Sequence, residues 1–176
     1  VETTLKSDLT VEQFGRDEYK IPFRKTIGSI VGVEAKDVSI LSVSRVTVAR
    51  RRLTENALQI VYDITAMVTE VLDDDEATID DLLTSIQTNL DDALASTAPN
   101  ENFVDILADT ASSLGYTAAA TAFDLLEAAD VTISELEVLA VNTPEPTHGP
   151  TKTPDDFPLL EVVIPLSVFG FFTLIG

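Results

Sequence analysis

The sequence predicts an α+β domain in which an antiparallel sheet carries helices on one face. Short runs alternate apolar and polar residues with period two, as strands do, and longer runs repeat apolar residues with helical spacing. Along the chain these runs follow the order strand, helix, strand, strand, helix, helix, strand. That order is typical of the split β-α-β, or ferredoxin-like, arrangement. An apolar fraction of 45% in 176 residues is enough for a packed core.

The first strand is predicted over residues 1–5, where apolar and polar residues alternate. Thr10 followed by Gln13 is a capping-box pattern and predicts a helix that ends at Gly32. Pro22 is expected in the first turn of that helix, because proline lacks the N–H that later turns need. The apolar face of the helix consists of Phe14, Tyr19, Phe23, Ile27, Ile30 and Val31.

Residues 38–48 and 58–68 are predicted to be two strands of a hairpin, since both are rich in β-branched residues and contain no Pro or Gly. Arg50, Arg51 and Arg52 then lie at the hairpin tip.

The second half is predicted to be mainly helical. Asp73 to Glu76 opens a helix, with a second capping signal at Thr78 and Asp81, and Pro99-Asn100 ends it. A further helix over residues 103–114 ends at Gly115, and residues 118–129 favour a helix. The last strand is expected over residues 131–140, with a bulge at Ser134-Glu135 where the alternation slips.

Three regions follow from this pattern: a domain at residues 1–142, a Pro/Thr-rich linker at 143–158, and an apolar segment at 159–176. Five of the eight prolines lie in the linker, which predicts an extended spacer. The last eighteen residues carry one charge, Glu161, and predict a membrane helix, cut short or just long enough. Two alternatives are a buried helix or strand on a partner, and a tail removed when a lipid anchor is attached. The chain begins at Val1 rather than Met. We therefore expect either that a targeting segment has been removed or that this sequence starts after the natural first residue.

Charge is distributed unevenly. Residues 1–52 hold ten of the eleven Lys and Arg and seven of the thirty acids, whereas residues 53–176 hold one basic residue, Lys152, and twenty-three acids. The net charge of −19 argues against nucleic acid as a partner, because such binding needs clustered cations. An acidic body with one basic cluster indicates a protein partner or self-association.

Arg50, Arg51 and Arg52 form the densest basic cluster and are the candidate partner-binding residues. They could dock on an acidic surface, including that of another copy. Alternatively they form a solvated turn neutralised by Glu55 and Asp63, or a processing site for a dibasic protease.

Asp73, Asp74, Asp75 and Glu76 are a candidate for weak Ca²⁺ or Mg²⁺ binding. They lack the central Gly and the terminal Glu of a helix-loop-helix calcium loop, so the alternative is a solvated acidic helix start.

Catalytic groups and cofactors are not expected. The lone histidine, His148, lies in the predicted linker, and the absence of Cys removes thiolate chemistry and Cys-type zinc sites. A carboxylate-based hydrolase is a remote alternative, because abundant acids form pairs by chance.

Gly28-Ser29-Ile30-Val31 resembles the cleavage sequence of self-cleaving SEA domains, but it falls inside a helical pattern here. More broadly, the stretch Ile27 to Val33, the strand 38–43, the turn Arg50 to Leu53 and the strand 58–68 are similar to SEA-like, ferredoxin-like ectodomain modules of microalgal surface and secreted proteins, such as those of diatoms. The resemblance covers roughly residues 10–142 and implies a non-enzymatic extracellular or lumenal module.

From these features we expect a membrane-tethered interaction or structural domain that mediates protein–protein assembly on an extracellular or organelle-lumen face, the thylakoid lumen included. The alternative is an accessory subunit of a large membrane complex, such as an algal photosynthetic one.

Overall fold

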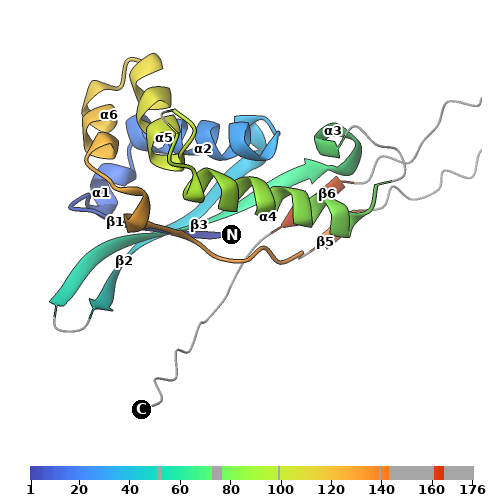
Figure 1. Ribbon diagram of the computed structural model, residues 1–176, viewed down its shortest axis with the longest axis horizontal. Helices are drawn as coiled ribbons and strands as arrows, with labels where there is room; N and C mark the ends of the chain where they lie inside the picture. Colours follow the sequence, from blue (N-terminus) through green and yellow to red (C-terminus); the bar gives the residue numbers. More distant parts are fainter. Residues whose placement is uncertain (51–52, 73–76, 99, 139, 143–160, 165–176) are drawn as a thin grey trace, which may run out of the picture.

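The computed structural model describes residues 1–50, 53–72, 77–98, 100–138, 140–142 and 161–164. It confirms an α+β fold with an antiparallel sheet. The helices lie on one side of the sheet, and the other face is left open to solvent by the described elements (Figure 1).

The central sheet has the order β4-β1-β3-β2, and every neighbouring pair is antiparallel. Because β1 and β2 both run antiparallel to β3, they run parallel to each other with β3 inserted between them. This is compatible with the predicted split β-α-β arrangement. The four strands are β1 (Glu2–Lys6), β2 (Val38–Arg50), β3 (Leu53–Met67) and β4 (Val131–Ile133).

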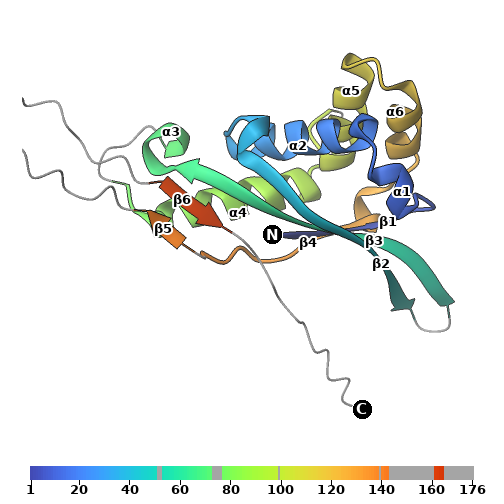
Figure 2. The ribbon, with the colours of Figure 1, turned by 180° about the vertical axis from the view of Figure 1, so that it is seen from behind.

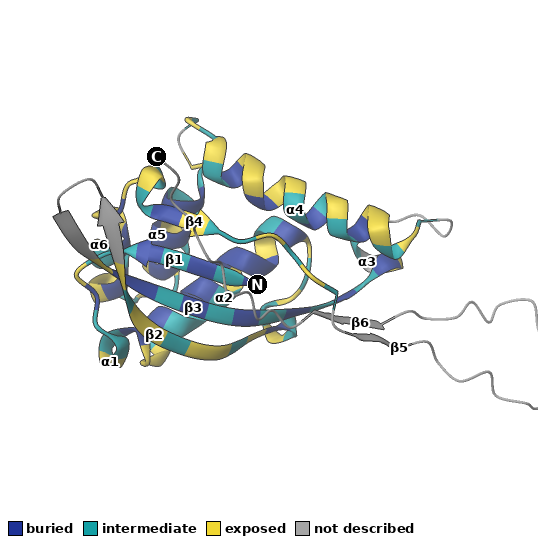
Figure 3. Ribbon diagram, turned by 90° about the horizontal axis from the view of Figure 1, so that it is seen from below, coloured by how far each residue is buried: buried dark blue, intermediate teal, exposed yellow. Residues whose placement is uncertain are grey.

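Burial alternates along β1 and β3, as Figure 3 shows. In β3 the even-numbered residues from Leu58 to Ala66 are buried beneath the helices, whereas Gln59, Val61 and Asp63 are half-buried on the opposite face. The alternation of apolar and polar residues in the sequence therefore indicates a sheet with one face covered by helices and the other exposed to solvent.

The predicted last strand is wrong in its length. β4 ends at Ile133, and β5 (Ala140–Asn142) is a separate strand. The cause lies at Ser134, whose side-chain Oγ accepts a hydrogen bond from the Glu2 nitrogen at 3.0 Å while its own nitrogen donates to the Glu2 carbonyl at 2.9 Å. A side chain thus takes the place of the next backbone acceptor, and the strand ends instead of forming a bulge.

The start of the apolar C-terminal segment also differs from the prediction. Glu161–Ile164 forms strand β6, not a helix, and pairs with β3 from Ile64 to Met67 and with β5. β6 lies on the same edge of β3 as β1, because Ile64 pairs with β2 on its other edge. The linker residues 143–158 and residues 159–160 and 165–176 lie outside the described residues.

The first predicted helix is two helices, α1 (Val11–Phe14) and α2 (Asp17–Val31). The capping box at Thr10 and Gln13 is confirmed, with both reciprocal hydrogen bonds present. Arg16 has an extended backbone and separates the helices. Pro22 is consequently the sixth residue of α2 rather than part of its first turn, which removes the hydrogen bond to the Glu18 carbonyl, and its ring is buried.

α2 ends at Gly32, as predicted. Gly32 has a left-handed φ of 81°, a conformation that favours glycine. Four residues earlier, Gly28 allows a close approach, because a Cβ there would lie 2.7 Å from the Val33 carbonyl oxygen. Gly28-Ser29 thus lies within a regular helix and not in the strained turn that SEA-type self-cleavage requires.

The remaining helices follow the predicted caps closely. Thr78 and Asp81 form a second capping box at the start of α4, and Asn102 caps α5. Residues 118–129 are partly helical, and α3 begins at Val68, where the sequence predicted continued strand. The helices are α3 (Val68–Leu72), α4 (Ile79–Ala95), α5 (Phe103–Ser113) and α6 (Thr117–Asp124), with single 3-10 turns η1 (Ala35–Asp37) and η2 (Ala128–Asp130).

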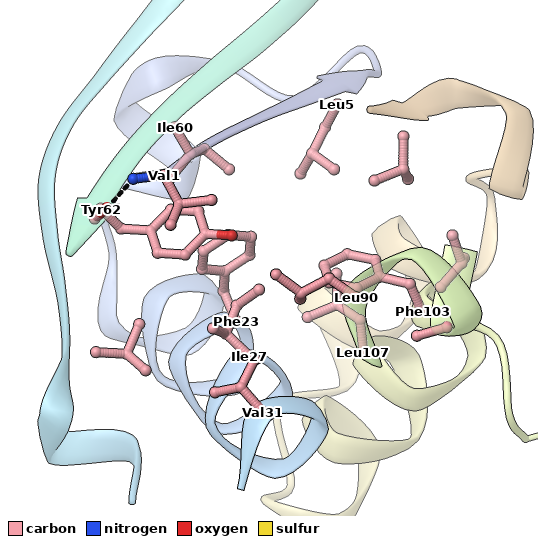
Figure 4. Packing of buried hydrophobic residues seen from close by; sticks show 14 of the residues in the cluster. Val1, Leu5, Phe23, Ile27, Val31, Ile60, Tyr62, Leu90, Phe103 and Leu107 are labelled. Carbon is pink, nitrogen blue, oxygen red and sulfur yellow. Dashed lines mark hydrogen bonds between the residues drawn. The ribbon is translucent and has the colours of Figure 1, made fainter. Parts of the chain in front are cut away.

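Phe23 on α2 lies at the centre of the core (Figure 4). Its fully buried ring packs edge-to-face against Phe14 of α1, Tyr62 of β3 and Phe103 of α5, with centroid separations of 5.6, 5.4 and 6.4 Å. Edge-to-face aromatic pairs add stability beyond the area they bury. One side chain therefore connects three helices to the central strand.

Replacing Phe23 by Ala should lower the free energy of unfolding by about 3–5 kcal/mol, because it leaves a cavity where four elements meet. Urea denaturation followed by circular dichroism measures this loss. Leu125→Ala is the control, since Leu125 is 79% exposed and should change the free energy by less than about 0.5 kcal/mol. Equal losses in the two variants would contradict the central role of Phe23.

Candidate protein-interaction site

The predicted hairpin is confirmed, and its distal part projects from the body. β1 ends where Lys6 pairs with Ala57, but β2 and β3 stay paired as far as Arg50 and Leu53. Residues 46–50 and 53–56, which together with the two residues between them are called the arm below, thus form a two-stranded ribbon that extends past α1 and the helical layer (Figure 2). Arg50 ends β2, while Arg51 and Arg52 lie outside the described residues.

The arm and the segment from α4 to β4 carry opposite charge. Residues 45–56 contain four arginines and one acid, Glu55. Residues 77–138, which form α4 to β4, contain twelve acids and no Lys or Arg. Arg45, just before the arm, is exposed on β2. A basic arm of this kind suits an acidic protein surface, where charge complementarity increases the rate of association and fixes orientation.

A hollow of about 640 Å³ adjoins the base of the arm. Asn56 of the arm lines it together with Lys6, Asp8, Leu125 and Asp130. The Lys6 side chain is only 12% exposed, and its ammonium donates to the Ala129 carbonyl at 3.4 Å and lies 3.9 Å from Asp130. An ammonium, two carboxylates and an exposed leucine side by side can receive a polar side chain with an aliphatic stem.

Sequence reasoning missed this hollow. Its lining comes from the end of β1, α1, β3 and the residues after α6, segments as far apart as Lys6 and Asp130. The residues carry no motif, and each taken alone resembles an ordinary residue of a solvated surface. The only signal in the sequence is Leu125-Leu126 directly after a helix, which indicates apolar residues near a helix end.

The predicted cation site is not placed by the structure. Asp73, Asp74, Asp75 and Glu76 lie outside the described residues, as does His148. Within the described ranges, no group of three or more His, Cys, Asp or Glu residues is arranged to hold a metal ion.

Asp63 is a half-buried acidic residue on the open face of the sheet. Its Oδ1 atom is buried and accepts no hydrogen bond from any described group. Burial raises the pKa of the Asp63 carboxyl above its usual value, although the positive Val1 nitrogen opposes the shift. An ionised carboxylate here costs stability, because its solvation is not replaced by a partner.

Asp63→Asn should therefore raise the melting temperature at neutral pH. Because the pKa in the folded state is raised, the cost of the charge is fully present above that pKa, and it disappears as pH falls towards the ordinary aspartate value of 3.8. Melting curves across this range should show the advantage of the variant shrinking with acidity. Asp109→Asn, at an exposed site on α5, controls for the change in net charge. An advantage that does not depend on pH would contradict this assignment.

Comparisons with protein-family models, curated proteins and solved structures found no match to this chain. The similarity to SEA-like microalgal modules therefore stays a prediction. In the part of the chain that the structure describes, no helix combines the length and apolar character needed to cross a membrane.

Proposed function

We propose that the chain is a non-enzymatic interaction domain that mediates protein–protein assembly through its basic arm. The observation that carries the proposal is the projection of a positively charged ribbon from a body whose segment from α4 to β4, residues 77–138, contains acids and no Lys or Arg. In the views of Figures 1 and 2 the arm points away from α4, so that it meets other molecules rather than the acidic helices of its own chain.

The docking surface of the partner should be acidic, and another copy of this chain offers one. Opposite charges at an interface speed encounter, and like charges brought face to face cost several kcal/mol. Exposed charges are screened within about 8 Å at physiological ionic strength, so arm-dependent association should weaken as salt is added.

Changing Arg50, Arg51 and Arg52 together to Glu should weaken this association by about tenfold or more, because like charges would then face each other. The native mass of the full chain in mild non-ionic detergent, with the co-purifying chains identified, measures assembly. The matched control is Arg16→Glu with Lys20→Glu and Lys25→Glu, which changes net charge equally at the start of α2 and on the helix itself. An unchanged native mass and affinity in the arm variant would contradict the docking role.

We further propose that the chain is held at a membrane by the residues that follow β6. Residues 165–176 contain no charged side chain, and the proline-rich residues 143–158 would act as the spacer. Since β6 pairs with β3, the tether would begin after Ile164 and not at residue 159. Attachment on an extracellular or lumenal side is the orientation we propose for the acidic body.

Two truncations test the tether. A chain ending at Ile164 should lose binding to phosphatidylcholine vesicles but keep the melting temperature of the full body, because β6 is retained. A chain ending at Pro158 should also melt at a lower temperature, since β5 and the end of β3 lose their partner strand. Vesicle flotation and thermal melting measure the two effects. Undiminished flotation of the chain ending at Ile164 would contradict the tether.

A further inference from the structure

The outer edge of β2 is open. β2 pairs with β3 along one side, and among the described elements no strand pairs with its other side. A free edge presents unpaired N–H and C=O groups to another chain. Natural proteins protect such edges with Pro, charge or short length, yet residues 39–44 contain no Pro, Gly or charged residue, and β2 has thirteen residues. Arg24 donates to the Val38 carbonyl, so the open stretch begins after Val38.

Exposed side chains mark the same stretch. Ser39, Leu41, Ser42 and Ser44 are exposed, and Leu41 sits where the register with β3 shifts between Ile40 and Ser42. Leu41 is 53% exposed, and among the described residues only Leu125 is another large hydrophobic residue classed as exposed. A strand added along this edge would cover Leu41 and satisfy the edge backbone groups at once.

Charge around Leu41 is arranged so that the edge is complementary to itself. Asp37 lies four residues before Leu41, and Arg45 lies four residues after it. Asp37 ends η1 directly before β2, and Arg45 lies near the start of the arm. When two β2 edges run antiparallel, the Asp37 end of each copy therefore meets the Arg45 end of the other, whereas a parallel pair brings like ends together. Opposite charges at an interface attract, and like charges repel.

We infer that two copies of the chain pair antiparallel through their β2 edges, around a two-fold axis at Ser42. This inference rests on the proposed assembly function and names its partner and its geometry. The contact is isologous, with the same surface on both copies. It joins the two sheets into one continuous sheet and places both sets of helices on the same face.

The net charge of −19 does not oppose this contact strongly. β2 is the strand furthest from α4, which lies along the opposite edge of the sheet (Figure 3). Joining the β2 edges therefore keeps the α4 helices, each with four aspartates, at the two far ends of the combined sheet. Charges separated by more than about 8 Å are largely screened at physiological salt.

Single cysteines test the inference, because the chain contains no cysteine of its own and any disulfide must join two copies. Full-length variants Ser39→Cys, Leu41→Cys, Ser42→Cys and Ser44→Cys are oxidised with copper phenanthroline in mild detergent, and the linked dimer is measured on non-reducing gels. These sites are exposed, so the fold should be retained. Leu125→Cys is the control, since it is exposed but lies after α6 and is not part of the β2 edge.

We expect Leu41→Cys or Ser42→Cys to form linked dimer. Ser39→Cys and Ser44→Cys should each link poorly to themselves but link to one another when mixed, because Leu41 is left out of the ladder and an antiparallel pair about Ser42 then sets Ser39 opposite Ser44. Self-linking at all four sites would indicate a parallel or disordered contact and overturn the inference. Linking no better than in Leu125→Cys would also overturn it. If the association that depends on Arg50, Arg51 and Arg52 then persists, the proposed function stands and only the edge contact fails.

Discussion

The edge-to-face packing around Phe23 is the interaction on which the rest of the structure depends. The ring joins α1 and α5 to the middle of β3, the strand that every other part of the sheet is built on. Because β1 and β3 place alternate residues under this ring and its neighbours, the helical layer is confined to one face of the sheet. The opposite face and the arm are then left for contacts with other molecules.

Local signals in the sequence predicted most of the fold. Thr10 with Gln13, Thr78 with Asp81, and Gly32 act over three or four residues, and the structure confirms each of them. The errors occur where a distant part of the chain decides. Ser134 ends β4 through hydrogen bonds to Glu2, and Pro22 lies inside α2 with its ring buried in the core. Neither contact can be read from the neighbouring sequence.

The same difference between local signals and distant contacts explains which parts of the candidate site could be predicted from the sequence. The arm was predictable, because Arg50 to Arg52 stand between two strong strand patterns. The hollow at its base was not, because Lys6 and Asp130 meet only after the sheet has formed. Glu161–Ile164 is a further case: an apolar run rich in β-branched residues suits a membrane segment and a sheet strand equally. Its pairing with Ile64 to Met67, nearly a hundred residues earlier, makes it a strand.

β3 also has a mechanical consequence. One end of this strand carries the arm, and the other end is paired with β6 immediately before the apolar tail. If a partner holds the arm while the tail is fixed, tension between the two passes along the axis of β3. Because the tail follows β6, the hydrogen bonds of the β3–β6 ladder carry this load; they lie across its direction, so they are loaded in shear and must break together rather than one at a time. Resistance to force would then be set by the rate at which β6 separates from β3, not by the equilibrium stability of the sheet.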